Sequence, residues 1–190
     1  RMIILEYDNQ GYMNTGAQLS YATPLGHRTS TSEVGDANTG KGFHHKDTAQ
    51  IFAACHLPYV FTASEGYPED FMRKVAKAQW YAKREGMVYG KVLSFCPLNW
   101  RTTDDAAEDV LQAALDSCFF PIYEVEKAHT TITYDPDSVG RRRPVADWLA
   151  LMGKTKHLLT PENAERLESI ESEIDRRWQR LKIMHAHEGL

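Results

Sequence analysis

The sequence has few cysteines, no excess of basic residues and no long apolar segment. Its three cysteines, Cys55, Cys96 and Cys118, are an odd number and lie far apart in 190 residues, which argues against a disulfide scaffold and fits a reducing cytoplasm. The formal net charge of −4 gives no reason to expect a nucleic-acid partner, because nucleic-acid binders are usually basic on one face. No apolar run reaches the roughly 20 residues of a membrane-spanning helix, so we expect no membrane partner.

What the sequence does have is a short apolar run, residues 3–7, that ends in Asp8-Asn9 and opens into a loop containing Gly11 and Asn14. An apolar run bounded by turn residues predicts a buried strand. In open α/β sheets, ligands bind beyond the carboxyl ends of the strands. The side-chain amide oxygen of Asn9 and the backbone carbonyl of Gly11 are suitable ligands for a hard cation that holds a diphosphate. The same residues are also common in simple turns. Because this core-type strand begins almost at Arg1, we expect residues upstream to be missing from this sequence.

Further along the chain, segments whose apolar residues have the spacing of a helix or a strand alternate with groups of turn residues. In residues 15–46 the apolar residues have no regular spacing, which predicts a long loop. The loop would either lie on the surface or form a lid over the ligand. We expect helices at 48–54, 68–82, 104–118, 145–152 and 161–184, and strands at 59–63, 87–95, 122–125 and 130–134. This order predicts an α/β fold, a parallel sheet with helices on both faces. Residues 1–125 would form the ligand-binding domain and residues 126–190 a C-terminal extension, whose long amphipathic helix supplies core or a subunit interface.

Several short motifs occur in a fixed order along nearly the whole chain. They are Asp8-Asn9-Gln10-Gly11-Tyr12-Met13-Asn14-Thr15-Gly16, Ala22-Thr23-Pro24-Leu25-Gly26, Lys46-Asp47, Pro58-Tyr59-Val60, Ala63-Ser64-Glu65-Gly66-Tyr67-Pro68-Glu69-Asp70 and Cys96-Pro97-Leu98-Asn99-Trp100. In this order they resemble the beta subunit of 2-oxoacid:ferredoxin oxidoreductases, the family that includes pyruvate synthase. The resemblance implies a partial thiamine-diphosphate-binding fold with a C-terminal helical extension.

The first motif resembles the second half of the family's thiamine-diphosphate motif. The first half, which begins with Gly-Asp-Gly some two dozen residues earlier, is not in this sequence. The resemblance implies that Asn9 and the Gly11 carbonyl bind magnesium (Mg²⁺), with the upstream aspartate as third ligand. It implies Asn14 as the catalytic residue near the reactive carbon, although a helix cap or an Asx-turn would also account for Asn14. The implied cofactor-binding residues are Asp8, Asn9, Gly11, Tyr12, Met13, Asn14 and Thr15.

Cys96 follows the strand predicted at 87–95. In the family, a cysteine at this place is the fourth ligand of a [4Fe–4S] cluster whose other three cysteines precede the thiamine motif, so the resemblance implies that Cys96 is a metal ligand. Iron–sulfur clusters normally need four thiolates, whereas a single cysteine is otherwise often a small buried hydrophobe. We expect Cys55 and Cys118, which lie among alanines and phenylalanines, to be such core residues.

The resemblance implies oxidative decarboxylation or cleavage of a small 2-oxoacid. Electrons would pass through [4Fe–4S] clusters to ferredoxin, in a hetero-oligomer with alpha and gamma or delta subunits. Coenzyme A would accept the acyl group of a pyruvate-like substrate. Where the pyruvate enzymes usually carry Ala-Trp, this sequence has His27-Arg28. Two potentially cationic side chains near the site favour a more anionic substrate, such as oxalate, with Arg28 contacting it. Alternatively, both residues face solvent or another subunit.

Two other classes of function stay open. A non-redox thiamine-diphosphate decarboxylase would need the diphosphate site but no cluster, and a non-catalytic module would use the loop to bind a partner subunit. We expect no zinc site at His44-His45, since adjacent histidines point apart and no third ligand has suitable spacing. Arg141 to Arg143 predict a solvated or subunit-contacting turn, or a docking site for an acidic electron carrier.

Overall fold

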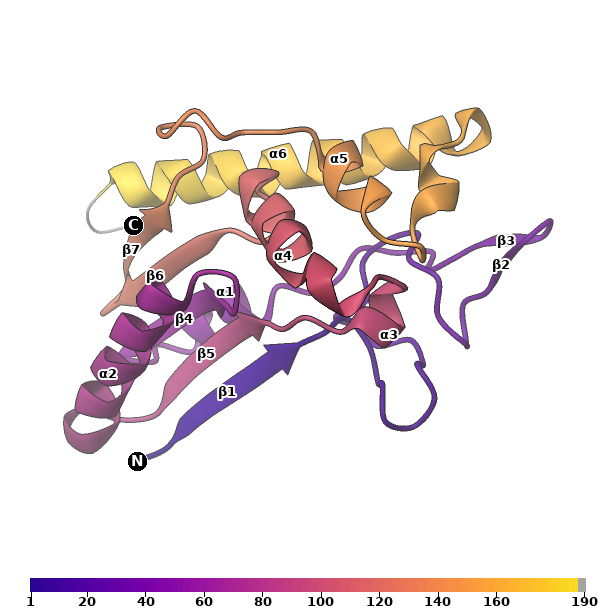
Figure 1. The fold of residues 1–190 in the computed structure, drawn as a ribbon. Helices are drawn as coiled ribbons and strands as arrows, with labels where there is room; N and C mark the ends of the chain where they lie inside the picture. Colours follow the sequence, from indigo (N-terminus) through magenta and orange to yellow (C-terminus); the bar gives the residue numbers. More distant parts are fainter. Residues whose placement is uncertain (188–190) are drawn as a thin grey trace.

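The computed structural model describes residues 1–187 and has a central five-stranded sheet in the order β1-β5-β4-β6-β7. The three strands at one edge are parallel, whereas β6 pairs antiparallel with β4 and β7 pairs antiparallel with β6. The predicted α/β class is therefore confirmed, with a mixed, mostly parallel sheet (Figure 1). The strands are β1 (Ile3–Asp8), β4 (Tyr59–Ser64), β5 (Val88–Leu93), β6 (Ile122–Glu126) and β7 (His129–Tyr134).

The expectation of a wholly parallel sheet is wrong at β6 and β7. Two residues, Lys127 and Ala128, join these strands, with φ of 50° and 69°. A two-residue turn with both φ values positive closes a β-hairpin, and a hairpin makes its strands antiparallel. The predicted division of the chain between residues 125 and 126 stays a prediction, although the strands on its two sides pair in one sheet.

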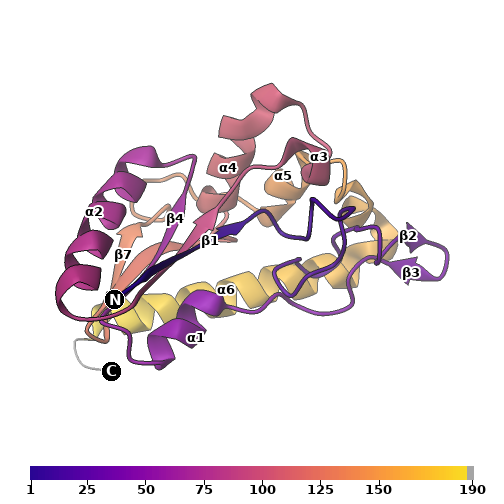
Figure 2. The ribbon, with the colours of Figure 1, turned by 90° about the horizontal axis from the view of Figure 1, so that it is seen from below.

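Helices cover both faces of the sheet, as predicted, because successive side chains of a strand point to opposite faces. Along β4, Tyr59, Phe61 and Ala63 pack toward α2, while Val60 belongs to the larger core that includes Ala49 of α1 and the buried stripe of α6. Figure 2 shows α1 and α6 on one side of the sheet and α2 on the other. The helices are α1 (Thr48–Ala54), α2 (Pro68–Arg84), α3 (Pro97–Trp100), α4 (Ala107–Asp116), α5 (Val145–Ala150) and α6 (Ala164–Ala186).

Local sequence signals explain where most helices begin. The Asp47 carboxylate accepts a hydrogen bond of 3.2 Å from the Gln50 N–H and caps α1, and Pro68 is the first residue of α2. The predicted helix at 104–118 is a 3₁₀ turn (Asp104–Ala106) followed by α4. The last predicted helix, at 161–184, begins with a 3₁₀ turn (Pro161–Asn163) before α6, and another 3₁₀ turn (Lys156–Leu159) precedes it. None of the helices within residues 1–187 is long and apolar enough to cross a membrane.

Residues 15–46 form the long connection predicted from their composition, with one small hairpin that the sequence did not indicate. The hairpin pairs β2 (Val34–Gly35) with β3 (Asn38–Thr39). The connection is tied to the C-terminal region, since the Arg166 guanidinium donates to the Lys41 carbonyl at 3.2 Å and His157 Nε2 lies 2.9 Å from the Gly26 carbonyl oxygen. It therefore packs between the end of β1 and the start of α6.

Two cysteine predictions have different outcomes. Cys118 is buried, as expected. Cys55 is exposed, so its assignment to the core is wrong. It follows the last residue of α1, a seven-residue helix whose buried residues, Thr48 and Ala49, lie in its first turn, which leaves its carboxyl end in solvent.

Candidate functional site

A pocket of about 310 Å³ lies at the carboxyl end of β1. This volume is at the lower end of the roughly 300–1,000 Å³ typical of small-ligand sites. Tyrosines form part of its wall, and both carboxylate and ammonium groups reach it. Its lining residues are Glu6, Tyr7, Asp8, Asn9, Gly11, Tyr12, Ser20, Tyr21, Ala22 and Lys46. Four of the predicted cofactor-binding residues, Asp8, Asn9, Gly11 and Tyr12, are therefore brought together here.

The loop after β1 has a defined hydrogen-bonded shape. The Gln10 N–H donates to Asp8 Oδ1 at 2.9 Å, which reverses the chain, with Gln10 at a φ of 70°. Tyr12 and Gln18 then exchange two backbone hydrogen bonds of 3.1 Å. A Cβ atom at Gly11 would lie 3.0 Å from the Gln18 carbonyl oxygen. Position 11 therefore needs glycine for this close approach of two backbone segments.

The other predicted residues of this loop lie farther out. Asn14 and Thr15 are exposed on the turn that the Tyr12–Gln18 pair closes, and Met13 is half-buried. None of these three lines the pocket. The contacts predicted for them, including the catalytic role of Asn14, stay predictions.

Asp8 is buried together with three lysines, none of which was predicted from the sequence. Asp8 is 6% exposed, and Lys41, Lys91 and Lys154 are 1%, 5% and 0% exposed. Lys91 Nζ lies 3.0 Å from Asp8 Oδ2 and 3.6 Å from Glu6 Oε1. Burial disfavours the charged ammonium, but these carboxylates outweigh burial and raise the pKa of Lys91. Lysine is rarely buried without a partner, so composition and periodicity gave no signal for this cluster.

The other two lysines have different surroundings. Lys41 Nζ donates to the carbonyl oxygens of Ser20 at 3.1 Å and of Thr23, and burial lowers its pKa to about 8. Lys154 Nζ has no hydrogen-bond partner within the described residues. Burial lowers the pKa of Lys154 to about 7, while the charges of Asp8 and Cys96 act in the opposite direction.

The segment between β5 and α3 lies at the same end of the sheet as this loop (Figure 1), and it contains Cys96. The Ser94 N–H, just after β5, donates to the Asp8 carbonyl at 3.1 Å. Cys96 is half-buried and precedes α3. The Asn99 side-chain amide and the Trp100 indole N–H both donate to the Asn9 carbonyl, at 2.7 Å and 3.1 Å. These hydrogen bonds join the motif that begins at Cys96 to the motif that begins at Asp8, about 90 residues earlier in the chain.

No group of three or more metal-ligating side chains occurs within residues 1–187. A metal at Cys96 or Asn9 would therefore need further ligands. The two adjacent histidines lie in different surroundings: His44 Nε2 is 3.4 Å from the Ser169 hydroxyl, and His45 Nε2 is 2.7 Å from Arg177.

The two residues expected to favour an anionic substrate, His27 and Arg28, lie in different surroundings. Arg28 Nε forms an ion pair of 2.5 Å with Glu33 and does not line the pocket, so its predicted contact with substrate stays a prediction. His27 is buried against Trp148, with ring centroids 5.7 Å apart. Burial and the nearby Lys154 charge hold its pKa well below the usual value. His27 is therefore neutral and does not supply positive charge.

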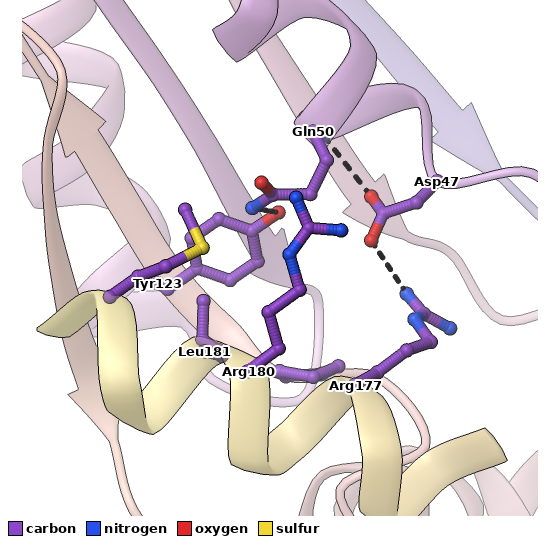
Figure 3. A pocket seen from close by; sticks show the side chains of 8 residues that line it. Asp47, Gln50, Tyr123, Arg177, Arg180 and Leu181 are labelled. Atoms are coloured by element: carbon purple, nitrogen blue, oxygen red, sulfur yellow. Dashed lines mark hydrogen bonds and ion pairs between the residues drawn. The ribbon is translucent and has the colours of Figure 1, made fainter. Parts of the chain in front are cut away.

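A second cavity lies between α6, α1 and β6, as Figure 3 shows. The Gln50 amide donates to the Tyr123 hydroxyl at 2.9 Å, and Arg177 pairs with Asp47 at 3.0 Å. Arg180 extends from α6 toward the same group. At about 40 Å³ this cavity has room for only a few waters. We therefore interpret it as part of the polar contact between α6, α1 and β6.

The amino-acid sequence of the chain was compared with those of known proteins. No family model matches the chain. The chain is 38% identical over 167 residues to pyruvate synthase subunit PorB of Methanocaldococcus jannaschii, covering 88% of this chain and 54% of that protein. It is 36% identical over 182 residues to the same subunit of Thermotoga maritima, covering 95% and 54%. It is 33% identical over 180 residues to ketoisovalerate oxidoreductase subunit VorB of Pyrococcus horikoshii, covering 95% and 55%.

The chain is homologous to 2-oxoacid:ferredoxin oxidoreductase beta subunits. The resemblance carried by the sequence motifs is thereby confirmed. The chain spans about half the length of the beta subunits that it matches, 54% of the first two. Because the match covers 95% of the chain, it includes the segment that contains Cys96.

Proposed function

We propose that this chain is part of the beta subunit of a thiamine-diphosphate-dependent 2-oxoacid:ferredoxin oxidoreductase. One observation carries the proposal: α3, which begins just after Cys96, is hydrogen-bonded to the loop that lines the pocket. A cofactor bound at Asn9 and a cluster bound at Cys96 would therefore lie close together. Electron transfer from a substrate-bearing cofactor to an iron–sulfur cluster needs such proximity.

The residues of the pocket fit a diphosphate with a magnesium ion. Mg²⁺ prefers oxygen ligands from carboxylate, amide and carbonyl groups, and Asn9 and Gly11 both line the pocket. The Asn9 carbonyl already accepts two hydrogen bonds, so Asn9 would bind the metal through its side-chain oxygen. The ammonium group of Lys46, also in the lining, complements a diphosphate.

Cys96 fits a cluster ligand. It is only half-buried, and Pro97 fixes the backbone φ and provides no N–H next to the thiol. The buried Lys154 ammonium has no partner within the described residues and interacts with the Cys96 charge, so this region favours an anionic group. Cys96 would be one of four thiolates. The other three would come from the part of the beta subunit that this chain does not span.

When bound, thiamine diphosphate stabilises the carbanion produced by decarboxylation, and an iron–sulfur cluster accepts electrons one at a time. The chain's own residues position these groups. Asn9 and Gly11 would hold the diphosphate and its magnesium ion at the strand end, and Tyr12 and Tyr21 would form part of the wall beside it. Asn99 fixes the loop to α3 through its hydrogen bond to the Asn9 carbonyl.

The substrate would be a small 2-oxoacid, since the named relatives are subunits of pyruvate and ketoisovalerate enzymes. The partners would be the alpha and the gamma or delta subunits and ferredoxin. Coenzyme A would take part if the substrate is pyruvate-like. The three cysteines, an odd number and far apart, support a reducing cytoplasmic location.

The test is to assay the assembled enzyme for iron, sulfide, thiamine diphosphate and Mg²⁺. We expect Asn9→Ala to weaken thiamine diphosphate and Mg²⁺ binding together by at least tenfold in calorimetry, because one ligand oxygen is lost. Asn38→Ala, in the distant hairpin, is the matched control and should bind both normally. Unchanged affinity in Asn9→Ala would exclude the metal assignment.

The same assays separate the two alternatives. A protein that binds thiamine diphosphate but contains no iron would be a non-redox decarboxylase subunit. A protein that binds neither thiamine diphosphate nor Mg²⁺ would be a non-catalytic interaction module.

A further inference from the structure

Asp8 and three lysines, Lys41, Lys91 and Lys154, are buried, and the charge of Asp8 acts on each of these lysines. Asp8 is paired with Lys91 at 3.0 Å, and the ammonium of Lys41 is satisfied by backbone carbonyls of residues 20 to 23. Lys154 is the remaining cation, fully buried and without a hydrogen-bond partner in the described part of the chain.

The backbone next to Lys154 is hydrogen-bonded to the residue that ends α3, the short helix that Cys96 precedes. The Gly153 N–H donates to the Arg101 carbonyl at 3.2 Å, and a Cβ atom at Gly153 would lie only 2.9 Å from that carbonyl oxygen. Arg101 is the residue that ends α3, and Cys96 is the residue that precedes it. On the other side, the Thr155 hydroxyl donates to the Leu149 carbonyl at 2.6 Å. These contacts fix the backbone on both sides of Lys154.

A buried ammonium without partners is unfavourable in its charged form, and burial accordingly lowers the pKa of Lys154. An anion bound nearby would favour the charged form again. Asp8 and Cys96 are the two acidic groups whose charges act on Lys154. Since Asp8 already has Lys91 as its partner, the group left for Lys154 to balance is the one at Cys96.

We infer that Lys154 is the buried counter-charge of the anionic group that Cys96 binds, an iron–sulfur cluster, and that Lys154 raises the reduction potential of this cluster. This inference rests on the proposed function. Four thiolates give a [4Fe–4S] site a net negative charge, and reduction adds one more electron to it. The negative charge of the cluster favours the protonated form of Lys154, and the resulting cation stabilises the reduced form of the cluster more than the oxidised form. Net charge and hydrogen bonds are known to set the potentials of such clusters.

The experiment compares Lys154→Met, Lys154→Arg and wild type in the assembled enzyme. The midpoint potential of each cluster is measured by EPR-monitored redox titration. In Lys154→Met we expect one cluster to become at least tenfold harder to reduce, a fall in potential of about 59 mV for a one-electron couple. Lys154→Arg keeps the positive charge and should stay near the wild-type potential. Lys41→Met removes another buried lysine, one already bound by carbonyls, and is the matched control with unchanged cluster potentials.

Thermal unfolding with and without the cluster gives a second, independent readout. Because the unbalanced charge is unfavourable in the cluster-free form, Lys154→Met should raise the melting temperature of that form and lower cluster retention. A side chain with a purely structural role would instead destabilise both forms alike.

Each outcome decides the inference. It is overturned by a Lys154→Met enzyme that has full iron content and unchanged potentials, or by one that is destabilised equally in both forms. A Lys154→Met enzyme that folds but loses iron, while Lys154→Arg retains it, supports the inference. A wild-type assembly that contains no cluster overturns the proposed function, and the inference with it.

Discussion

The side-chain amide of Asn99 donates a hydrogen bond of 2.7 Å to the carbonyl oxygen of Asn9. The indole N–H of Trp100 donates to the same oxygen at 3.1 Å. A carbonyl oxygen has two lone pairs, and both are used here by the segment that follows Cys96. The loop after β1 and the start of α3 therefore move as one unit, which links the geometry of the two proposed cofactor sites.

Asn99→Leu should weaken the connection between the loop after β1 and the start of α3. The substitution leaves the Asn9 carbonyl with one donor and should cost about 1–3 kcal/mol in the free energy of unfolding. We also expect weaker thiamine diphosphate binding, measured by calorimetry. Asn163→Leu is the control, because Asn163 makes the same kind of bond, 3.0 Å to the His157 carbonyl, away from the pocket. Equal cofactor affinity in Asn99→Leu and Asn163→Leu would contradict the coupling.

Cys96→Ala should remove one cluster and stop ferredoxin reduction, while thiamine diphosphate still binds because Asn9 and Gly11 are intact. The measurements are iron and sulfide per subunit and the EPR signal of the reduced enzyme. Cys118→Ala should lower stability by at most a few kcal/mol, since its side chain is buried. Cys55→Ala should change stability by less than about 0.5 kcal/mol, since Cys55 is exposed. Full iron content in Cys96→Ala would favour the non-redox alternative.

Arg28 and Glu33 offer a paired test of substrate charge. If the loop that carries them covers the substrate, Arg28→Ala should raise KM for a dianion such as oxalate more than KM for pyruvate. Glu33→Gln removes the ion-pair partner 2.5 Å away and should lower KM for the dianion, because the guanidinium is then free to bind a second carboxylate. Equal effects on both substrates would place Arg28 outside the substrate path.

Lys41 predicts a pH dependence of stability. Burial lowers its pKa to about 8 in the folded protein, against about 10.4 for an unfolded lysine. Between these values the unfolded state binds more protons, so the contribution of Lys41 to stability rises with pH. Lys41→Met should be less stable at pH 7 by roughly 1–3 kcal/mol, because carbonyls lose their donor.

The difference in the free energy of unfolding between wild type and Lys41→Met should then increase from pH 8 to pH 10. Urea unfolding of the full-length subunit at several pH values measures it, and Lys156→Met serves as the control because Lys156 is exposed. Parallel stability curves for wild type and Lys41→Met across this range would contradict the shifted pKa.

The elements of the parallel part of the sheet were predictable from their residues. Residues 59–63 and 87–95 are apolar runs between turn residues, and Pro68 and Asp47 mark helix starts. The antiparallel hairpin was not predictable, because Lys127 and Ala128 adopt positive φ without the glycine or asparagine that usually signals such a turn.

The candidate site was predictable only in part. Asp8, Asn9, Gly11 and Tyr12 come together in the pocket because they follow one strand. The lysine cluster was not predictable, since Lys154 lies between glycine and threonine with no apolar period around it. Its burial results from Gly153 packing against Arg101, a tertiary contact between segments about fifty residues apart.

β1 is an edge strand of the described sheet, since β5 is its single partner. Its other side presents backbone N–H and C=O groups that a further strand can bind. A strand added there in parallel would end beside Asn9, and its last residues would become a wall of the pocket. Strand addition and ligand binding would then be thermodynamically linked, each increasing the affinity of the other by the same factor. The affinity for thiamine diphosphate, measured with and without the added strand, gives the size of that factor.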